Sequence, residues 1–143
     1  YPFWNLIGNG GILSTTGDMY KWMTALAGDA VLSHEAREKL LTPYLADYAY
    51  GWDVIETDRG TLVQHDGGST LGNSAEVRWF VDQGLLIVLF CNQSQGWTPL
   101  IQIVRDDIET LAFGGEVDLP PAAAPQSLDH RSVTGGISPR AGN

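Results

Sequence analysis

The sequence is poor in the residues that build covalent or metal-based frameworks. It contains a single cysteine, Cys91, which excludes an internal disulfide and a metal site built on several cysteines. Cys91 follows the apolar run LLIVLF, and we expect a buried, unreactive thiol. No run reaches the roughly 18 apolar residues of a transmembrane helix, so we expect no membrane span.

Positive charge is also scarce. Eight Lys and Arg residues against 17 Asp and Glu residues give a formal net charge of −9 at pH 7. Nucleic acids and anionic membrane surfaces both attract faces rich in Lys and Arg, so we expect neither as a partner. The length of 143 residues and a hydrophobic content of 43% are typical of one globular domain with its own core.

The two ends of the chain differ in composition from its middle. The chain begins without methionine at YPFWNLIGNGG and shows no signal-peptide pattern, so we expect a piece of a longer protein. Residues 116–143 contain LPPAAAP and TGGISPRAGN, which are typical of a linker or disordered tail. The domain segment is therefore expected over residues 1–115.

The spacing of apolar residues predicts an α+β fold, in which an antiparallel sheet is flanked by helices. The predicted helices cover residues 16–27, 34–41 and 98–112, and the predicted strands cover about 48–57, 61–65, 74–82 and 85–91. Thr15 and Asp18 match a capping box at the start of the first helix, and Ser33 is placed to cap the second. Trp22 lies on the apolar face of the first helix and is expected in the core.

The last two predicted strands differ in their patterns. In SAEVRWFVD, apolar and polar residues alternate, except that Phe80 falls on the polar side, so we expect that face to be half covered. LLIVLFC is apolar on both faces, which favours a place in the middle of a sheet.

Five segments, in order, resemble the C-terminal part of the serine β-lactamase-like hydrolases, which include class C β-lactamases, DD-peptidases and esterases. The segments are GNGGILSTTGDMYKWMTAL, LSHEAREKLLTP, YAYGWDV, VQHDGG and LLIVLFCNQS. YAYGWDV departs from the family's Tyr-Gly-x-Gly-Trp strand, because Ala49 and Tyr50 replace part of it. The resemblance covers about residues 5–113.

The resemblance implies a five-stranded antiparallel sheet with helices on both faces and an active site beside a helical domain. The N-terminal strands and most of the helical domain would then lie outside this chain. The strand at 85–91 would lose its N-terminal partner, and its apolar edge would pair with the missing N-terminal half or a second copy. The resemblance is compatible with a periplasmic or secreted protein, and the sequence leaves the compartment open.

Two of the family's three catalytic motifs are absent. Ser-x-x-Lys places the nucleophile and its activating amine one helical turn apart, but Lys21 and Lys39 are preceded at that spacing by Asp18 and Ala36. No tyrosine is followed two positions later by asparagine, so Tyr-x-Asn is missing too. The resemblance therefore implies part of a hydrolase that acts through an acyl-enzyme, and we expect the chain alone to be inactive.

The third motif is similar to His65-Asp66-Gly67, in a position where the family often has Lys-Thr-Gly. The resemblance implies that His65 lies near the nucleophile and polarises the site or holds a substrate carboxylate. It also implies that Gly67 leaves room for the substrate and that the N–H of Gly68 is one of two oxyanion-hole donors. Asp66 and Ser69 are candidate substrate-binding residues. Without the resemblance, HDGG would be interpreted as a loop with a solvated histidine, and Asp66 as a turn residue.

Other interpretations stay open at the level of sequence. A separate Ser-His-Asp triad is compatible with any spacing, and its candidate nucleophiles are Ser14, Ser33, Ser69 and Ser74. The chain could also be a non-catalytic binding or assembly module that keeps the fold, or an unrelated α+β binding domain. No cofactor and no metal site is expected, and the expected ligand is a small-molecule acyl substrate.

Overall fold

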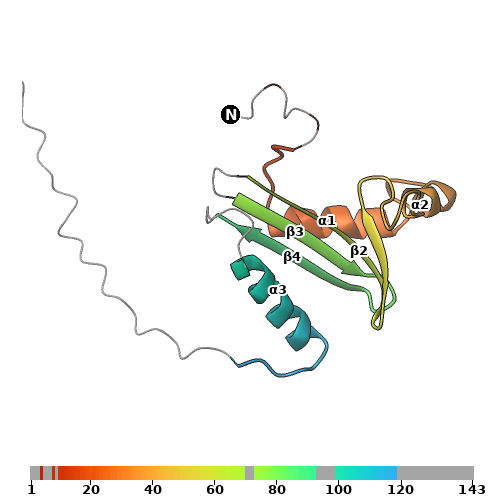
Figure 1. Cartoon of the computed structure of the whole chain (residues 1–143). Coiled ribbons are helices and arrows are strands. Elements are labelled where there is room, and N and C mark those ends of the chain that lie inside the picture. The colour runs from red at the N-terminus through yellow and green to blue at the C-terminus, as the bar shows by residue number, and fades with distance from the viewer. Residues whose placement is uncertain (1–3, 5–7, 9, 70–72, 93–98, 119–143) are drawn as a thin grey trace, which may run out of the picture.

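The structure is a computed structural model of the chain, and it describes residues 4, 8, 10–69, 73–92 and 99–118 (Figure 1). The elements in chain order are α1 (Thr16–Ala27), α2 (His34–Leu40), β1 (Asp53–Thr57), β2 (Gly60–Ser69), β3 (Asn73–Phe80), β4 (Leu85–Cys91) and α3 (Pro99–Ala112).

The four strands form one antiparallel sheet in the order β1-β2-β3-β4. Helices α1 and α3 lie on opposite sides of this sheet, and α2 follows α1 at one end of the molecule (Figure 1). This architecture confirms the α+β class and the helix-flanked antiparallel sheet. None of the helices in the described part is long and apolar enough to cross a membrane.

Strand alternation sends neighbouring residues of β3 to opposite faces of the sheet, and both faces are packed. On the side of α1, Val77 forms a buried cluster with Met23 and Leu26. On the side of α3, Phe80 is 1% exposed and packs edge-on against Phe113, with ring centroids 4.9 Å apart. The sequence predicted that the face of this strand with Phe80 is half covered, and α3 is the element that covers it.

Ion pairs join α3 to the sheet on this second face. Glu109 pairs with Arg59 and with Arg78, each at 2.9 Å. Glu76, which is buried, pairs with Arg78 at 3.5 Å and with Arg105 at 3.4 Å. These contacts explain why charged residues occupy the inner side of an otherwise apolar layer.

The predicted bounds of two strands are wrong. The strand expected over 48–57 begins at Asp53, because residues 48–52 turn, with a positive φ of 81° at Gly51. The strand expected over 61–65 continues to Ser69, because β3 pairs with β2 along this whole stretch. The tail expected over 116–143 falls mostly outside the described residues, which end at 118.

The prediction for LLIVLFC is also wrong in part, because β4 is an outer strand of the described sheet. Its residues are apolar on both sides because helices cover both faces, as shown by Val88 packing toward α1 and Leu89 toward α3.

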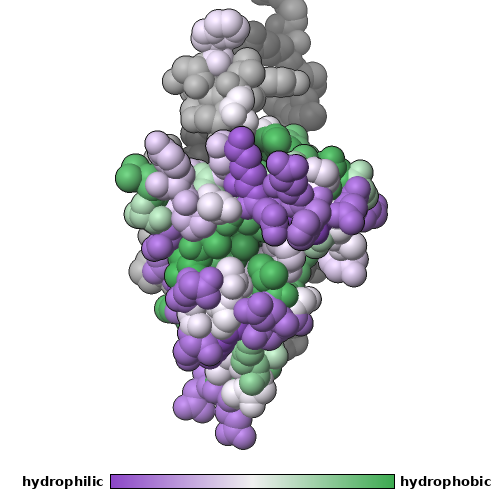
Figure 2. Space-filling model, turned by 90° about the vertical axis from the view of Figure 1, so that its right-hand side faces the viewer, coloured by the Kyte–Doolittle hydropathy of each residue, from purple (hydrophilic) through white to green (hydrophobic). Residues whose placement is uncertain are grey.

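Several large apolar side chains remain at the surface. Trp22 of α1 is 47% exposed, contrary to the expectation that it lies in the core. Ile103, Val104 and Leu111 are exposed on α3. Seen from the side of α2, hydrophobic residues also reach the surface between hydrophilic ones (Figure 2).

Candidate functional site

The HDGG stretch lies within β2, so the interpretations of HDGG as a loop and of Asp66 as a turn residue are wrong. His65 pairs with Val77 of β3, and Gly68 pairs with Ser74. Antiparallel pairing with β3 holds this part of the backbone extended in a regular register without a bulge.

Beyond Gln64, β2 has a strand partner on one side only. The pairing of β1 with β2 ends at Asp53 and Gln64, whereas β3 continues alongside β2 to Ser69. Residues 65–69 therefore have a strand edge that no described strand covers. Such an edge presents backbone donors and acceptors that can bind an extended ligand.

The register determines which backbone groups face this open edge. Both backbone groups of Thr61 point toward the β3 side, because its carbonyl accepts from the Val81 N–H at 3.0 Å and its N–H donates to Asp82 Oδ2 at 2.9 Å. Backbone groups alternate in direction along a regular strand. The N–H of Gly68, seven residues after Thr61, consequently points away from β3, toward the open edge.

Side-chain alternation separates His65 from Asp66. His65 lies on the same face of the sheet as Val63 and Val77, which belong to clusters on the α1 side. Asp66 lies on the α3 face, directly opposite Glu76. The two adjacent site candidates therefore do not share one face.

The glycines of the motif differ in the space around them. A Cβ atom added at Gly67 would meet no atom within 4 Å, whereas one at Gly68 would lie 3.3 Å from the carbonyl oxygen of Asn73. Gly67 thus adjoins open space on the His65 side of the strand. Ser69 pairs through its backbone with Asn73.

The His65 side chain is exposed and has an aromatic neighbour. Its Nε2 lies 3.3 Å from the hydroxyl oxygen of Tyr48, and the two ring centroids are 6.3 Å apart. Sequence reasoning missed Tyr48, because it placed this residue in a regular strand. The YAYGWDV segment had marked the region, but only the turn at 48–52 brings its first tyrosine to His65.

Two of the alternative serine nucleophiles lie just before helices. The Ser33 hydroxyl accepts from the N–H of Ala36 and caps α2, and the Ser14 hydroxyl donates to the carbonyl of Thr15. Ser74 lies in β3, paired with Cys91. In the described part of the chain, no group of three or more His, Cys, Asp and Glu side chains is placed to hold a metal ion.

Two comparisons with known proteins find matches to this chain. The family model described as Beta-lactamase matches residues 1–106. Penicillin-binding protein 4* of Bacillus subtilis (strain 168) is 26% identical over 120 residues, which cover 79% of this chain and 26% of that protein. The chain thus spans about a quarter of the length of this curated relative. No solved structure matches significantly.

Proposed function

The chain belongs to the beta-lactamase family of serine hydrolase-like proteins, and from this premise we propose that it forms one wall of an acyl-enzyme active site. The substrate would be an ester, peptide or β-lactam. The nucleophile and its lysine would come from a Ser-x-x-Lys segment outside this chain, so the chain alone would be inactive.

The open edge of β2 is the observation that carries this proposal. The N–H of Gly68 faces that edge, as an oxyanion-hole donor must. His65 lies three residues earlier, on the face where Gly67 leaves open space. In this proposal, the Gly68 N–H stabilises the oxyanion and His65 polarises the site or binds a substrate carboxylate.

Asp66 and Ser69 are the remaining candidates for substrate contacts. Asp66 lies on the opposite face from His65, so a substrate contact by Asp66 would have to come through its backbone. Its N–H faces the open edge by the same alternation as that of Gly68. Ser69 lies at the end of the open edge, and we propose it as a substrate contact there.

Covalent labelling of the purified chain tests whether the nucleophile lies outside this chain. We expect no label from a fluorophosphonate or a fluorescent penicillin, because the nucleophile would be elsewhere. A stoichiometric label mapped to a serine of this chain would overturn the proposal in favour of a local triad.

A graft tests the donor itself. The chain would replace the aligned 120 residues of the Bacillus subtilis relative, whose name records penicillin binding. Gly68→Pro removes the N–H, whereas the matched Gly68→Ala retains it. We expect the proline variant to be labelled by fluorescent penicillin about 100- to 1,000-fold more slowly than the alanine variant, the usual loss for one oxyanion-hole donor. Equal labelling rates in two folded grafts would exclude this role.

A binding or assembly role is the second candidate, and the outer position of β4 favours it. The edge of β4 that no described strand covers would pair with an N-terminal segment of a longer protein or with a second copy of the chain. Such pairing is compatible with the hydrolase proposal, because it completes the sheet without using the β2 edge.

A further inference from the structure

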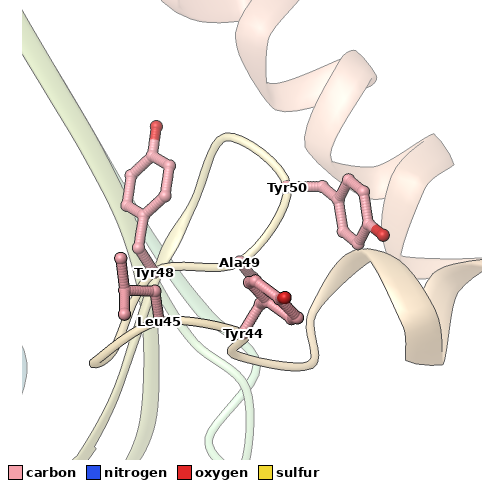
Figure 3. A pocket seen from close by; sticks show the side chains of 5 residues that line it. All are labelled: Tyr44, Leu45, Tyr48, Ala49 and Tyr50. Carbon is pink, nitrogen blue, oxygen red and sulfur yellow. The ribbon is translucent and has the colours of Figure 1, made fainter.

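The loop between α2 and β1 forms a small hollow lined by aromatic and apolar side chains. Its volume is about 240 Å³, and the lining residues are Tyr44, Leu45, Tyr48, Ala49 and Tyr50 (Figure 3). Ala49 is buried, whereas the leucine and the three tyrosines are between 45% and 93% exposed. Large apolar side chains that gather in one exposed patch are a common mark of a binding surface.

The backbone holds this loop in a defined shape. The N–H of Tyr48 donates to the carbonyl of Leu45 at 3.0 Å, and the carbonyl of Tyr48 accepts from the N–H of Tyr44 at 2.9 Å. Between them, Ala46 has a φ of 49°, in the left-handed region that non-glycine residues seldom occupy. A strained position that is retained in a hydrogen-bonded turn is typical of a functional loop.

Tyr48 connects the hollow to the candidate active site. Its ring lines the hollow, and its hydroxyl oxygen lies 3.3 Å from Nε2 of His65. A group bound in the hollow would therefore be separated from His65 by a single side chain.

The volume limits what the hollow can hold. Ligand pockets for complete drug-sized molecules have volumes of about 300–1,000 Å³, whereas a cavity of about 150 Å³ accepts benzene. At about 240 Å³, the hollow accommodates one ring and not a whole ligand. Its tyrosine rings offer the faces and edges against which an aromatic ring packs.

We propose that the hollow is a subsite for an aromatic substituent of the acyl substrate, and that Tyr48 is a positioning residue for His65. This assignment rests on the proposed function, because it presumes that a substrate reacts beside His65. In this proposal, the Tyr48 hydroxyl donates to Nε2 of His65, and the neutral histidine carries its proton on Nδ1.

Binding of two probes to the purified full chain tests the subsite without any need for turnover. Phenylacetate and acetate carry the same charge and differ by an aromatic ring. NMR titration should show phenylacetate binding about tenfold more tightly than acetate, as expected when about 55 Å² of apolar ring surface is buried, with the largest shifts at Tyr48 and Tyr50. Equal affinities would overturn the subsite.

Variants separate the two parts of the proposal. Leu45→Ala and Tyr48→Ala should each weaken phenylacetate binding, and Tyr20→Ala, an exposed tyrosine on α1, should leave it unchanged. Leu45 is 75% exposed, so its variant should fold even if Tyr48→Ala does not. Phenylacetate binding that survives both substitutions would place the ring elsewhere.

Tyr48→Phe retains the ring and removes the hydroxyl. We expect phenylacetate to bind as before, while the nitrogen chemical shifts of His65 change toward the tautomer protonated on Nε2. Unchanged shifts would overturn the positioning role, and Tyr20→Phe is the matched control. Because neither measurement involves an acyl-enzyme, failed penicillin labelling of the graft would refute the proposed function and leave these results interpretable.

Discussion

At the scale of single residues, two glycines of β2 differ in the space available for a Cβ atom. Gly67 has open space where a Cβ would lie, whereas Gly60 has a φ of 89° and a Cβ there would collide with the carboxylate of Asp82. That carboxylate accepts from the N–H of Thr61, so moving it breaks a hydrogen bond between the start of β2 and the turn after β3. The same substitution should therefore have different consequences at the two positions.

We expect Gly60→Ala to lower the free energy of unfolding by about 1–2 kcal/mol, the cost of a left-handed conformation for a residue with a Cβ. Gly67→Ala should leave it unchanged or raise it by up to about 1 kcal/mol, because it restricts the unfolded chain without strain. Denaturant unfolding of the two variants compares these effects. Equal destabilisation would contradict the open space found at Gly67.

Asp18 gives the stability of the chain a pH dependence with a defined sign. A hydrogen bond from Lys21 and one from Thr15 lower the pKa of Asp18 below its ordinary value of 3.8. Because the folded-state pKa is the lower one, the carboxylate stabilises the start of α1 above pH 3.8, and this contribution disappears as the pH falls through the folded-state pKa.

The measurement compares the unfolding free energy of the wild type with that of Asp18→Asn from pH 7 to pH 2. The difference should be constant near neutrality and should shrink in the acid range. A difference that persists at the lowest pH would show that the charge of Asp18 is not responsible.

At the scale of elements, α3 is attached to the sheet by charge as well as by apolar contact. Glu109 pairs with both Arg59 and Arg78, and its side chain is 17% exposed. Asp106, on the same helix, pairs with its neighbour Arg105 and is 63% exposed. The two acids therefore provide a matched comparison of a largely buried and an exposed ion pair.

Glu109→Ala should lower the free energy of unfolding by about 2 kcal/mol, since it removes one of the two carboxylate partners of the largely buried Arg78. Asp106→Ala should cost less than about 1 kcal/mol, as is usual for exposed pairs. Thermal or denaturant unfolding of the two variants measures both changes. Similar losses for the two variants would mean that apolar packing, such as that of Phe113 on Phe80, attaches the helix by itself.

At the scale of the whole molecule, β4 is an outer strand of the described sheet, and its sequence LLIVLFC has no charged residue and no proline. Edges of this kind pair with other chains unless they are covered. We expect the isolated chain to self-associate, with slow amide exchange along residues 85–91. Light scattering and hydrogen exchange measure both properties, and a monodisperse monomer with rapid exchange at these amides would contradict the proposal.

A charged substitution locates the cause of association. Phe90→Lys places a lysine on the outer strand at a side chain that is 41% exposed, and we expect it to shift the chain toward monomer. Val104→Lys makes the same change at a similarly exposed residue of α3 and serves as the control. If only the control dissociates the chain, the apolar surface of α3 is the interface instead.

Local features of the sequence determined the helices and indicated the family. Thr15 and Asp18 form the hydrogen bonds expected of a cap, and α1 covers Thr16–Ala27 as predicted, because capping and helical periodicity depend on residues within a few positions of each other. The ordered motifs likewise indicated the family, which the comparison over residues 1–106 confirms.

Only the tertiary structure decided how the motif is presented. That HDGG lies on a strand with one open edge, and that His65 and Asp66 face opposite sides, depends on where β1 stops pairing with β2. The contact between Tyr48 and His65 is likewise set by the turn before β1. Such pairings join residues that are distant in the chain, and no local periodicity encodes them.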